Sequence, residues 1–246
     1  MKAQKEAVLI HGWDPRQYNQ ALSPGAGPES AWSHRKEFVE LMKQRFDVRY
    51  FGLPGFDGVP EPDVTRYEVE DFADSFAKWM EESGKEARVI VGYSFGGVIA
   101  LDYKVRYGVE TPVVLISPAL ARKVTWRSKI AGMSGRFVPS FMETGLKDAY
   151  QKMFSRYYRE GTAFLKQSYD QVVRRDMTDE LLRVDPGGVL LIYGSRDEVT
   201  PWSLVQEKAI ERGLDYCIIE DGGHNIGQTH PNELVEAIDG FLNQSK

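Results

Sequence analysis

The residues best suited to chemistry lie in one short run, Gly92-Tyr93-Ser94-Phe95-Gly96. The β-branched stretch Val89–Val91 precedes this run and small, apolar residues follow it, so the pattern predicts a strand, a sharp turn and a helix. Ser94 then lies at the apex of the turn, where we expect a strained, positive φ. A side chain at Gly92 or Gly96 would collide where the chain enters and leaves such a turn. The Ser94 hydroxyl would project above the strand end, as a nucleophile requires.

A serine hydroxyl is a poor nucleophile at neutral pH, so it needs a base and an acid. Two later segments, each after an apolar run that predicts a strand, carry candidates: Gly194-Ser195-Arg196-Asp197-Glu198-Val199-Thr200-Pro201 and Glu220-Asp221-Gly222-Gly223-His224-Asn225. His224 is the expected base. The other histidines have different expected roles: His34 faces solvent, His230 opens the last helix and His11 holds a turn. Asp197 is the expected acid, and its neighbours in sequence leave alternatives open, namely Glu198, Glu220 and Asp221.

These residue types together suit acyl transfer. His224 would take the proton of Ser94 as an acyl carbon is attacked, and would later return it to the leaving group. Asp197 would fix the imidazole tautomer and stabilise the imidazolium. The tetrahedral oxyanion needs donors, and the expected pair is the backbone N–H groups of Phe95, which follows the serine, and Trp13, which follows the first predicted strand.

The rest of the chain alternates apolar, β-rich runs with amphipathic stretches. Six runs are predicted as strands: Ala7–Ile10, Val48–Phe51, Val89–Val91, Val113–Ile116, Val189–Tyr193 and Tyr216–Ile219. Helices are predicted between them, at about Ser33–Arg45, Val69–Glu82, Val98–Tyr107, Trp202–Arg212 and Pro231–Leu242. This order implies an α/β fold, a mostly parallel sheet of about six strands with helices on both faces. Ligands of such sheets bind beyond the carboxyl ends of the strands, where the candidate residues stand.

The alternation stops between residues 118 and 186, where aromatic and basic helical pieces replace the strands. We interpret residues 118–186 as an inserted helical cap, and residues 1–117 and 187–246 as the core. Trp126 and Phe137 in the insertion are expected to bind substrate together with Trp13 and Phe95. The many Lys and Arg residues of the insertion are interpreted as solvated helix faces, with attraction of anionic substrates as the alternative.

The segments around Ser94, Asp197 and His224 resemble the motifs of the α/β-hydrolase family, in kind and in chain order. The family's nucleophile elbow is Gly-x-Ser-x-Gly, its acid lies in Gly-x-x-Asp-x-x-x-Pro and its base follows a glycine. His11-Gly12 is similar to the family's oxyanion turn. The resemblance covers nearly the whole chain outside the insertion. Compared with the larger members of the family, this chain looks like one with a minimal sheet. It implies a serine hydrolase of the carboxylesterase type.

Composition and charge bear on the expected partners, location and cofactors. A chain of 246 residues with a net charge of −5 is ordinary for a soluble protein and argues against a nucleic-acid partner. No run is apolar for long enough to span a membrane, and the N-terminus does not resemble a signal peptide, so the expected location is the cytoplasm. Cys217 is the only cysteine, and Cys and His show no metal-ligand spacing. We therefore expect neither a metal nor another cofactor.

The expected activity is hydrolysis of carboxylic esters of small to medium acyl chain through an acyl-enzyme on Ser94. A carbon-carbon bond hydrolase or lyase acting on an anionic substrate is the alternative, and thioesters and amides stay open as substrates. A cap arginine pointing into the pocket would favour the anionic substrate. Outside enzymes, the same fold could serve as a ligand receptor. The sequence indicates neither the physiological substrate nor the oligomeric state.

Overall fold

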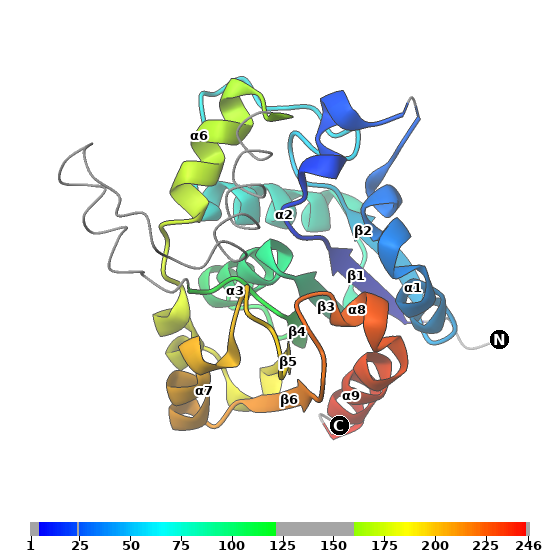
Figure 1. Cartoon of the computed structure of the whole chain (residues 1–246), viewed down its shortest axis with the longest axis vertical. Coiled ribbons are helices and arrows are strands. Elements are labelled where there is room, and N and C mark those ends of the chain that lie inside the picture. The colour runs from blue at the N-terminus through cyan, green and yellow to red at the C-terminus, as the bar shows by residue number, and fades with distance from the viewer. Residues whose placement is uncertain (1–4, 24, 122–159, 245–246) are drawn as a thin grey trace, which may run out of the picture.

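The computed structural model describes residues 5–23, 25–121 and 160–244. In this part of the chain six strands form one parallel sheet in the order β2-β1-β3-β4-β5-β6 (Figure 1). The strands are β1 Glu6–Ile10, β2 Asp47–Phe51, β3 Ala87–Tyr93, β4 Val113–Ile116, β5 Val189–Gly194 and β6 Asp215–Ile219. The predicted α/β fold is confirmed, and each predicted strand is present with its ends displaced by at most about two residues, the usual uncertainty of strand ends.

The central strands are continuous apolar runs because helices cover both faces of the sheet. Along β1, Val8 and Ile10 belong to one hydrophobic cluster, and Ala7 and Leu9 belong to another on the opposite face. The first cluster includes residues of α2 (Val69–Ser83) and α3 (Phe95–Tyr107). The second includes residues of α1 (Lys36–Lys43) and α9 (Pro231–Gln244), which lie on the other side of the sheet in Figure 1.

The first predicted helix is shorter than its predicted range. A 3-10 helix, η3, spans Pro28–Arg35, and α-helix begins only at Lys36. In η3 the buried side chains are the adjacent Ala31 and Trp32, which do not make a stripe of α-helical period. Phe38, Val39 and Met42 supply that stripe in α1. The apolar spacing that predicts an α-helix therefore starts later than expected.

The C-terminal part of the chain shows a similar difference. The predicted helix from Trp202 begins as a 3-10 turn, η6 (Trp202–Leu204), and continues as α7 (Gln206–Arg212). The short helix α8 (Ile226–Thr229) was not predicted, because four residues carry too little periodicity. The remaining 3-10 turns are η1 Pro15–Gln17, η2 Asn19–Ala21, η4 Thr178–Arg183 and η5 Pro186–Gly188.

Within the insertion the structure describes residues 118–121 and 160–186, so Trp126 and Phe137 lie outside the described residues. Its helix α6 (Ala163–Val172) is N-capped by Thr162, whose hydroxyl accepts from the Leu165 N–H. Phe164, Leu165 and Tyr169 belong to the first hydrophobic cluster, on the face of the sheet that α2 and α3 cover. This end of the insertion therefore packs into the core. Its division from the core at residues 118 and 186 remains a prediction.

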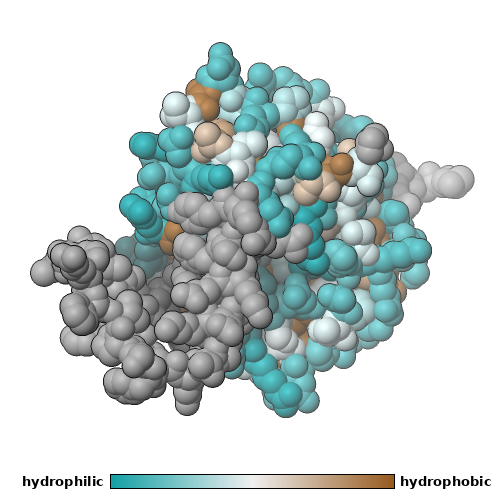
Figure 2. Space-filling model, turned by 45° about the horizontal axis from the view of Figure 1, so that its top comes forward, coloured by the Kyte–Doolittle hydropathy of each residue, from teal (hydrophilic) through white to brown (hydrophobic). Residues whose placement is uncertain are grey.

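Large apolar side chains on the surface are scattered. Those exposed among the described residues come from separate loops and elements: Val64, Tyr107, Val199, Ile210 and Tyr216. The face in Figure 2 shows the same mixture, with isolated hydrophobic residues among hydrophilic ones outside the grey atoms. None of the described helices combines the length and the hydropathy needed to cross a bilayer.

Candidate active site

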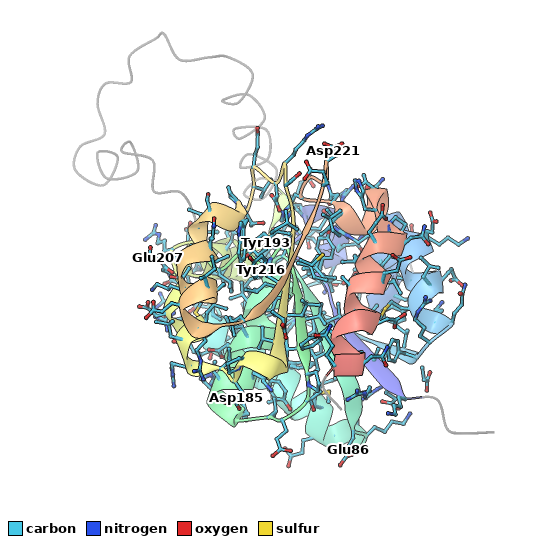
Figure 3. The ribbon with its side chains drawn as sticks, turned by 90° about the horizontal axis from the view of Figure 1, so that it is seen from below. Glu86, Asp185, Tyr193, Glu207, Tyr216 and Asp221 are labelled. Carbon is cyan, nitrogen blue, oxygen red and sulfur yellow. The ribbon has the colours of Figure 1, made fainter. Side chains whose placement is uncertain are left out.

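The sheet brings the predicted site residues to one edge. Figure 3 shows its polarity, with Asp221 after β6 at one end and Glu86 and Asp185, which precede β3 and β5, at the other. Ser94 directly follows β3, and the segments that carry Asp197 and His224 follow β5 and β6. The carboxyl ends of parallel strands meet at the same edge, so these three loops lie together.

Ser94 occupies a strained turn between β3 and α3, as predicted. Its φ is 53° and its ψ is −113°, and its N–H donates to the Ile116 carbonyl at 2.9 Å. A Cβ on Gly92 would overlap the Gly96 carbonyl, and a Cβ on Gly96 would overlap the Ile10 carbonyl. These backbone contacts force the tight approach that holds Ser94 in the left-handed region, so both glycines are required by packing.

The three predicted side chains are in continuous contact. Ser94 Oγ lies 3.2 Å from His224 Nε2, and His224 Nδ1 lies 2.9 Å from Asp197 Oδ2. An ionised carboxylate only accepts, so Nδ1 carries a proton toward Asp197 and leaves Nε2 to accept from the Ser94 hydroxyl. This arrangement is the one needed to remove the serine proton.

The alternative acids lie elsewhere in the two loops. Glu198 is exposed, although it neighbours Asp197 in sequence. Glu220 accepts from the Ser195 hydroxyl at 3.3 Å, and Asp221 forms an ion pair with Arg196. Among the carboxylates that the sequence left open, Asp197 is therefore the one in contact with His224.

Asp197 is only 5% exposed, and its loop surrounds the carboxylate with donors. The Val199 and Thr200 N–H groups donate to Oδ1 at 2.9 Å, and the Thr200 hydroxyl donates to Oδ2 at 2.9 Å. Burial raises the pKa of Asp197, but the hydrogen bond and positive charge of His224, with the bonds from Thr200, outweigh it and lower the pKa below its ordinary value. Asp197 is thus held as an anion.

This lowered pKa predicts a pH dependence of stability. A carboxylate whose pKa is lower in the folded state stabilises the fold above its unfolded pKa, 3.8 here, and loses that contribution as the pH falls through the folded value. Urea unfolding of wild type and Asp197→Asn should therefore show a difference in free energy of unfolding that shrinks between about pH 5 and pH 3. A difference that stays constant over this range would mean that folding does not lower the pKa of Asp197.

Two residues that the sequence did not single out hold the His224 loop. The Tyr93 hydroxyl donates to the His224 carbonyl at 2.8 Å and accepts from the Gly227 N–H at 3.3 Å. The Arg35 guanidinium stacks 4.0 Å from the Tyr93 ring centre and donates to Asn225 Oδ1 at 3.1 Å. Burial raises the pKa of Tyr93, which keeps its hydroxyl protonated and able to donate.

The supporting residues Thr200, Tyr93 and Arg35 differ in how far the sequence could have indicated them. Thr200 also contacts His224 Nδ1, at 3.2 Å, and its position three residues after Asp197 is a local pattern that could have indicated it. Tyr93 lies inside the elbow motif, but nothing in the motif indicates its partner. Arg35 reaches the site from the opposite end of the chain, so no local pattern could have found it.

Both predicted oxyanion donors border Ser94. Phe95 is the first residue of α3, so its N–H lies at the open end of the helix. Trp13 follows Gly12, and a Cβ built on Gly12 would lie 3.0 Å from Ser94 Cβ and 3.6 Å from Ser94 Oγ. The Gly12 backbone, which precedes Trp13, therefore lies beside the Ser94 side chain. The role of the two N–H groups as donors stays a prediction.

The side chains of Trp13 and Phe95 are packed in an aromatic cluster and are 8% and 5% exposed. The Trp13 ring contacts Phe95 and Tyr169 at 5.4 Å between ring centres, and its Nε1 donates to the Tyr18 hydroxyl at 2.7 Å. Tyr169 belongs to α6, so the insertion reaches the wall of the site. Substrate contact by Trp13 and Phe95 stays a prediction.

Within the described residues, His224 is the histidine that contacts the Ser94 hydroxyl, and the other three have different surroundings. His34 is exposed, and His230 is half-buried directly before α9. His11 is 2% exposed and contacts Asp57, in keeping with its predicted role in holding a turn. Across the described residues, no group of three or more His, Cys, Asp or Glu side chains is placed to hold a metal ion.

The chain is similar to known proteins in sequence and in fold. It is 29% identical over 142 residues to the abhydrolase domain-containing protein abhd-5.2 of Caenorhabditis elegans, covering 52% of this chain and 28% of that protein. The match thus spans less than a third of that relative's length.

Two solved structures show the same fold. The esterase EaEST of Exiguobacterium antarcticum is 16% identical, with a TM-score of 0.66 over 99% of this chain and 93% of that one. The meta-cleavage product hydrolase CumD of Pseudomonas fluorescens IP01 is 19% identical, with a TM-score of 0.67 over 99% of this chain and 92% of that one. These likenesses concern the fold alone.

The family assignment has independent support from the sequence. Residues 7–237 match the model of the alpha/beta hydrolase family. The match extends from the second residue of β1 through β6, and includes the elbow at Ser94 and the loops of Asp197 and His224. Sheet order, elbow geometry and family match agree, and the chain belongs to the alpha/beta hydrolase family.

Proposed function

We propose that the chain is a serine hydrolase that cleaves carboxylic esters of small to medium acyl chain. The observation that carries the proposal is the unbroken contact from Ser94 Oγ through the His224 ring to the buried Asp197 carboxylate. The strained elbow supports it, because strain at a turn persists where surrounding structure enforces it and is concentrated at functional sites.

In the first half of the proposed reaction, Ser94 Oγ attacks the ester carbonyl carbon while His224 Nε2 takes the hydroxyl proton. The imidazolium is stabilised by the Asp197 carboxylate. The carbonyl oxygen becomes an oxyanion that accepts from the Trp13 and Phe95 N–H groups, each worth about 3 kcal/mol in the transition state. The oxyanion then re-forms the carbonyl, the alkoxide leaves with the proton from Nε2, and the acyl group stays on Ser94.

The second half uses the same residues with water in place of the alcohol. His224 Nε2 removes a proton from the water as its oxygen attacks the acyl carbon, and a second oxyanion forms at the same donors. Collapse of this intermediate breaks the Ser94 ester bond, and the proton on Nε2 returns to Ser94 Oγ. The products are the carboxylic acid and the free enzyme.

A carbon-carbon bond hydrolase acting on an anionic substrate is the second candidate. It is retained because the meta-cleavage product hydrolase CumD and the esterase EaEST match this fold about equally well, so the fold does not choose between them. The basic residues that would favour an anionic substrate include Arg122, Lys123 and Arg127, which lie outside the described residues.

The test is hydrolysis of p-nitrophenyl esters from acetate to laurate, in parallel with neutral and anionic esters of one acyl length. Turnover that peaks at one chain length supports the esterase and sizes the acyl pocket. Equal kcat/KM for neutral and anionic esters would count against an anionic specificity. No turnover of any ester by the folded protein would overturn the esterase, and would favour the carbon-carbon hydrolase or a ligand receptor.

A further inference from the structure

A second histidine-aspartate contact lies buried beside the predicted oxyanion turn. His11 is 2% exposed, the Asp57 side chain is fully buried, and His11 Nε2 lies 2.7 Å from Asp57 Oδ2. The other ring nitrogen, Nδ1, lies 2.8 Å from the carbonyl oxygen of Gly12. The imidazole of His11 therefore bridges a buried acid and the backbone of the turn that precedes Trp13.

Asp57 is itself held in place. Its φ of 52° lies in the left-handed region, its N–H donates to the Gln17 carbonyl at 2.9 Å, and the Ser30 hydroxyl donates to its Oδ1 at 3.1 Å. Apart from the close approach of His11, Oδ2 has no hydrogen-bond partner among the described residues. The acid is thus fixed from three sides and directed at the His11 ring.

The contacts of the His11 ring indicate that its Nδ1 carries a proton. A carbonyl oxygen only accepts, so the 2.8 Å contact with Gly12 requires an Nδ1–H. The 2.7 Å contact with Asp57 requires a further proton, either on Nε2 or on the carboxyl oxygen, because two lone pairs would repel at that distance. The Leu53 N–H also approaches Nε2, at 3.4 Å. Nδ1 is protonated in both arrangements, so the donor to Gly12 is present whichever partner holds the second proton.

Anchoring the Gly12 carbonyl also orients the Trp13 N–H, because both belong to one planar peptide. The peptide is trans, so its C=O and N–H point in opposite directions. The Gly12 backbone lies against the Ser94 side chain, since a Cβ added to Gly12 would come within 3.6 Å of Ser94 Oγ. A rotation of this peptide plane would move the Trp13 N–H away from its predicted direction.

We propose that His11 and Asp57 are positioning residues that hold the Gly12-Trp13 peptide so that the Trp13 N–H faces the oxyanion. Asp57 fixes the ring through Nε2, and the ring fixes the peptide through Nδ1. The inference rests on the proposed function, in which the Trp13 N–H is one of the two oxyanion donors. It assigns the second histidine-aspartate contact to transition-state stabilisation, separate from the proton transfer by His224 and Asp197.

Two substitutions separate the two ends of the His11 ring. In His11→Asn the side-chain nitrogen takes about the position of Nδ1, so the bond to Gly12 is kept and the contact with Asp57 is lost. In His11→Gln the side-chain amide reaches about the position of Nε2, so the contact with Asp57 is kept and the bond to Gly12 is lost. His11→Asn leaves the buried Asp57 carboxyl without its partner, which is the more costly change for stability.

The two variants are expected to rank in opposite orders for kcat and for thermal stability. His11→Gln should lower kcat for p-nitrophenyl acetate by up to about 10²-fold with little change in KM, because a misdirected donor acts only in the transition state. His11→Asn should keep most of the wild-type kcat but unfold at a lower temperature than His11→Gln. If the two variants rank in the same order for kcat and for thermal stability, the role of His11 is purely structural and the proposal is wrong.

A measurement on the unsubstituted protein separates this inference from the proposed function. Long-range ¹H–¹⁵N correlation spectra of the histidine rings report which nitrogen of His11 is protonated. A protonated Nδ1 at neutral pH supports the anchored peptide, and an unprotonated Nδ1 overturns it, whether or not the variants fold. Absence of ester turnover by the folded wild type would instead overturn the proposed function.

Discussion

Replacing Ser94 with alanine is expected to lower kcat for ester hydrolysis by about 10⁶-fold, as loss of the nucleophile does in a triad enzyme. The physical reason is that Oγ is the atom that attacks and then carries the acyl group, and no other group replaces it. Alanine keeps the Cβ that the turn already accommodates at a φ of 53°, so the strain and the packing are unchanged. The measurement is kcat with p-nitrophenyl esters, together with the thermal unfolding temperature.

Ser117 provides a matched control. It is also a buried serine at positive φ, 43°, and it directly follows the neighbouring strand β4. Its Oγ has no hydrogen-bond partner within the described residues. Ser117→Ala should therefore leave kcat unchanged. Retention of ester hydrolysis by Ser94→Ala would mean that Ser94 is not the nucleophile.

Replacing Asp197 with asparagine should have the second largest effect, lowering kcat by about 10⁴-fold with the fold intact. The asparagine amide would donate to His224 Nδ1 where the carboxylate now accepts at 2.9 Å. The ring would then carry its proton on Nε2 and could not accept the proton of Ser94. The loss should appear in kcat, because binding of the ester does not involve the buried carboxylate.

Glu198→Gln is the control for this substitution. Glu198 is adjacent in sequence but exposed, so its loss should not change kcat. If Asp197→Asn kept wild-type kcat, the acid would have to be one of the neighbouring carboxylates, and Glu198→Gln, Glu220→Gln and Asp221→Asn would identify it.

Much of the fold could be predicted because its signals are local. The strands are apolar, β-branched runs, and Gly92 and Gly96 mark a turn that only glycine can form. Asp197 and His224 could be predicted because parallel strands deliver their following loops to one edge. By contrast, the change from 3-10 to α-helix at Lys36 depends on which face becomes buried, so the predicted helix start at about Ser33 was too early.

The supporting contacts of the site could not be predicted, because they join residues far apart in the chain. Arg35, the last residue of η3, meets Tyr93 and Asn225 only when η3 and the loop after β6 pack on the same face of the sheet. The contact of His11 with Asp57 likewise depends on how the chain after β2 folds back over the end of β1. Residue type indicated that His11 holds a turn, but its partner required the structure.

The most direct test of the central claim is covalent labelling with an alkyl fluorophosphonate, followed by mass spectrometry of the digested protein. Attack by the activated serine forms an oxygen-phosphorus bond and expels fluoride. We predict one phosphonyl adduct per chain, on the peptide that contains Ser94, absent from Ser94→Ala and formed more slowly by Asp197→Asn. No adduct on the folded wild type, or an adduct elsewhere with Ser94 unmodified, would contradict the assignment of Ser94 as the nucleophile.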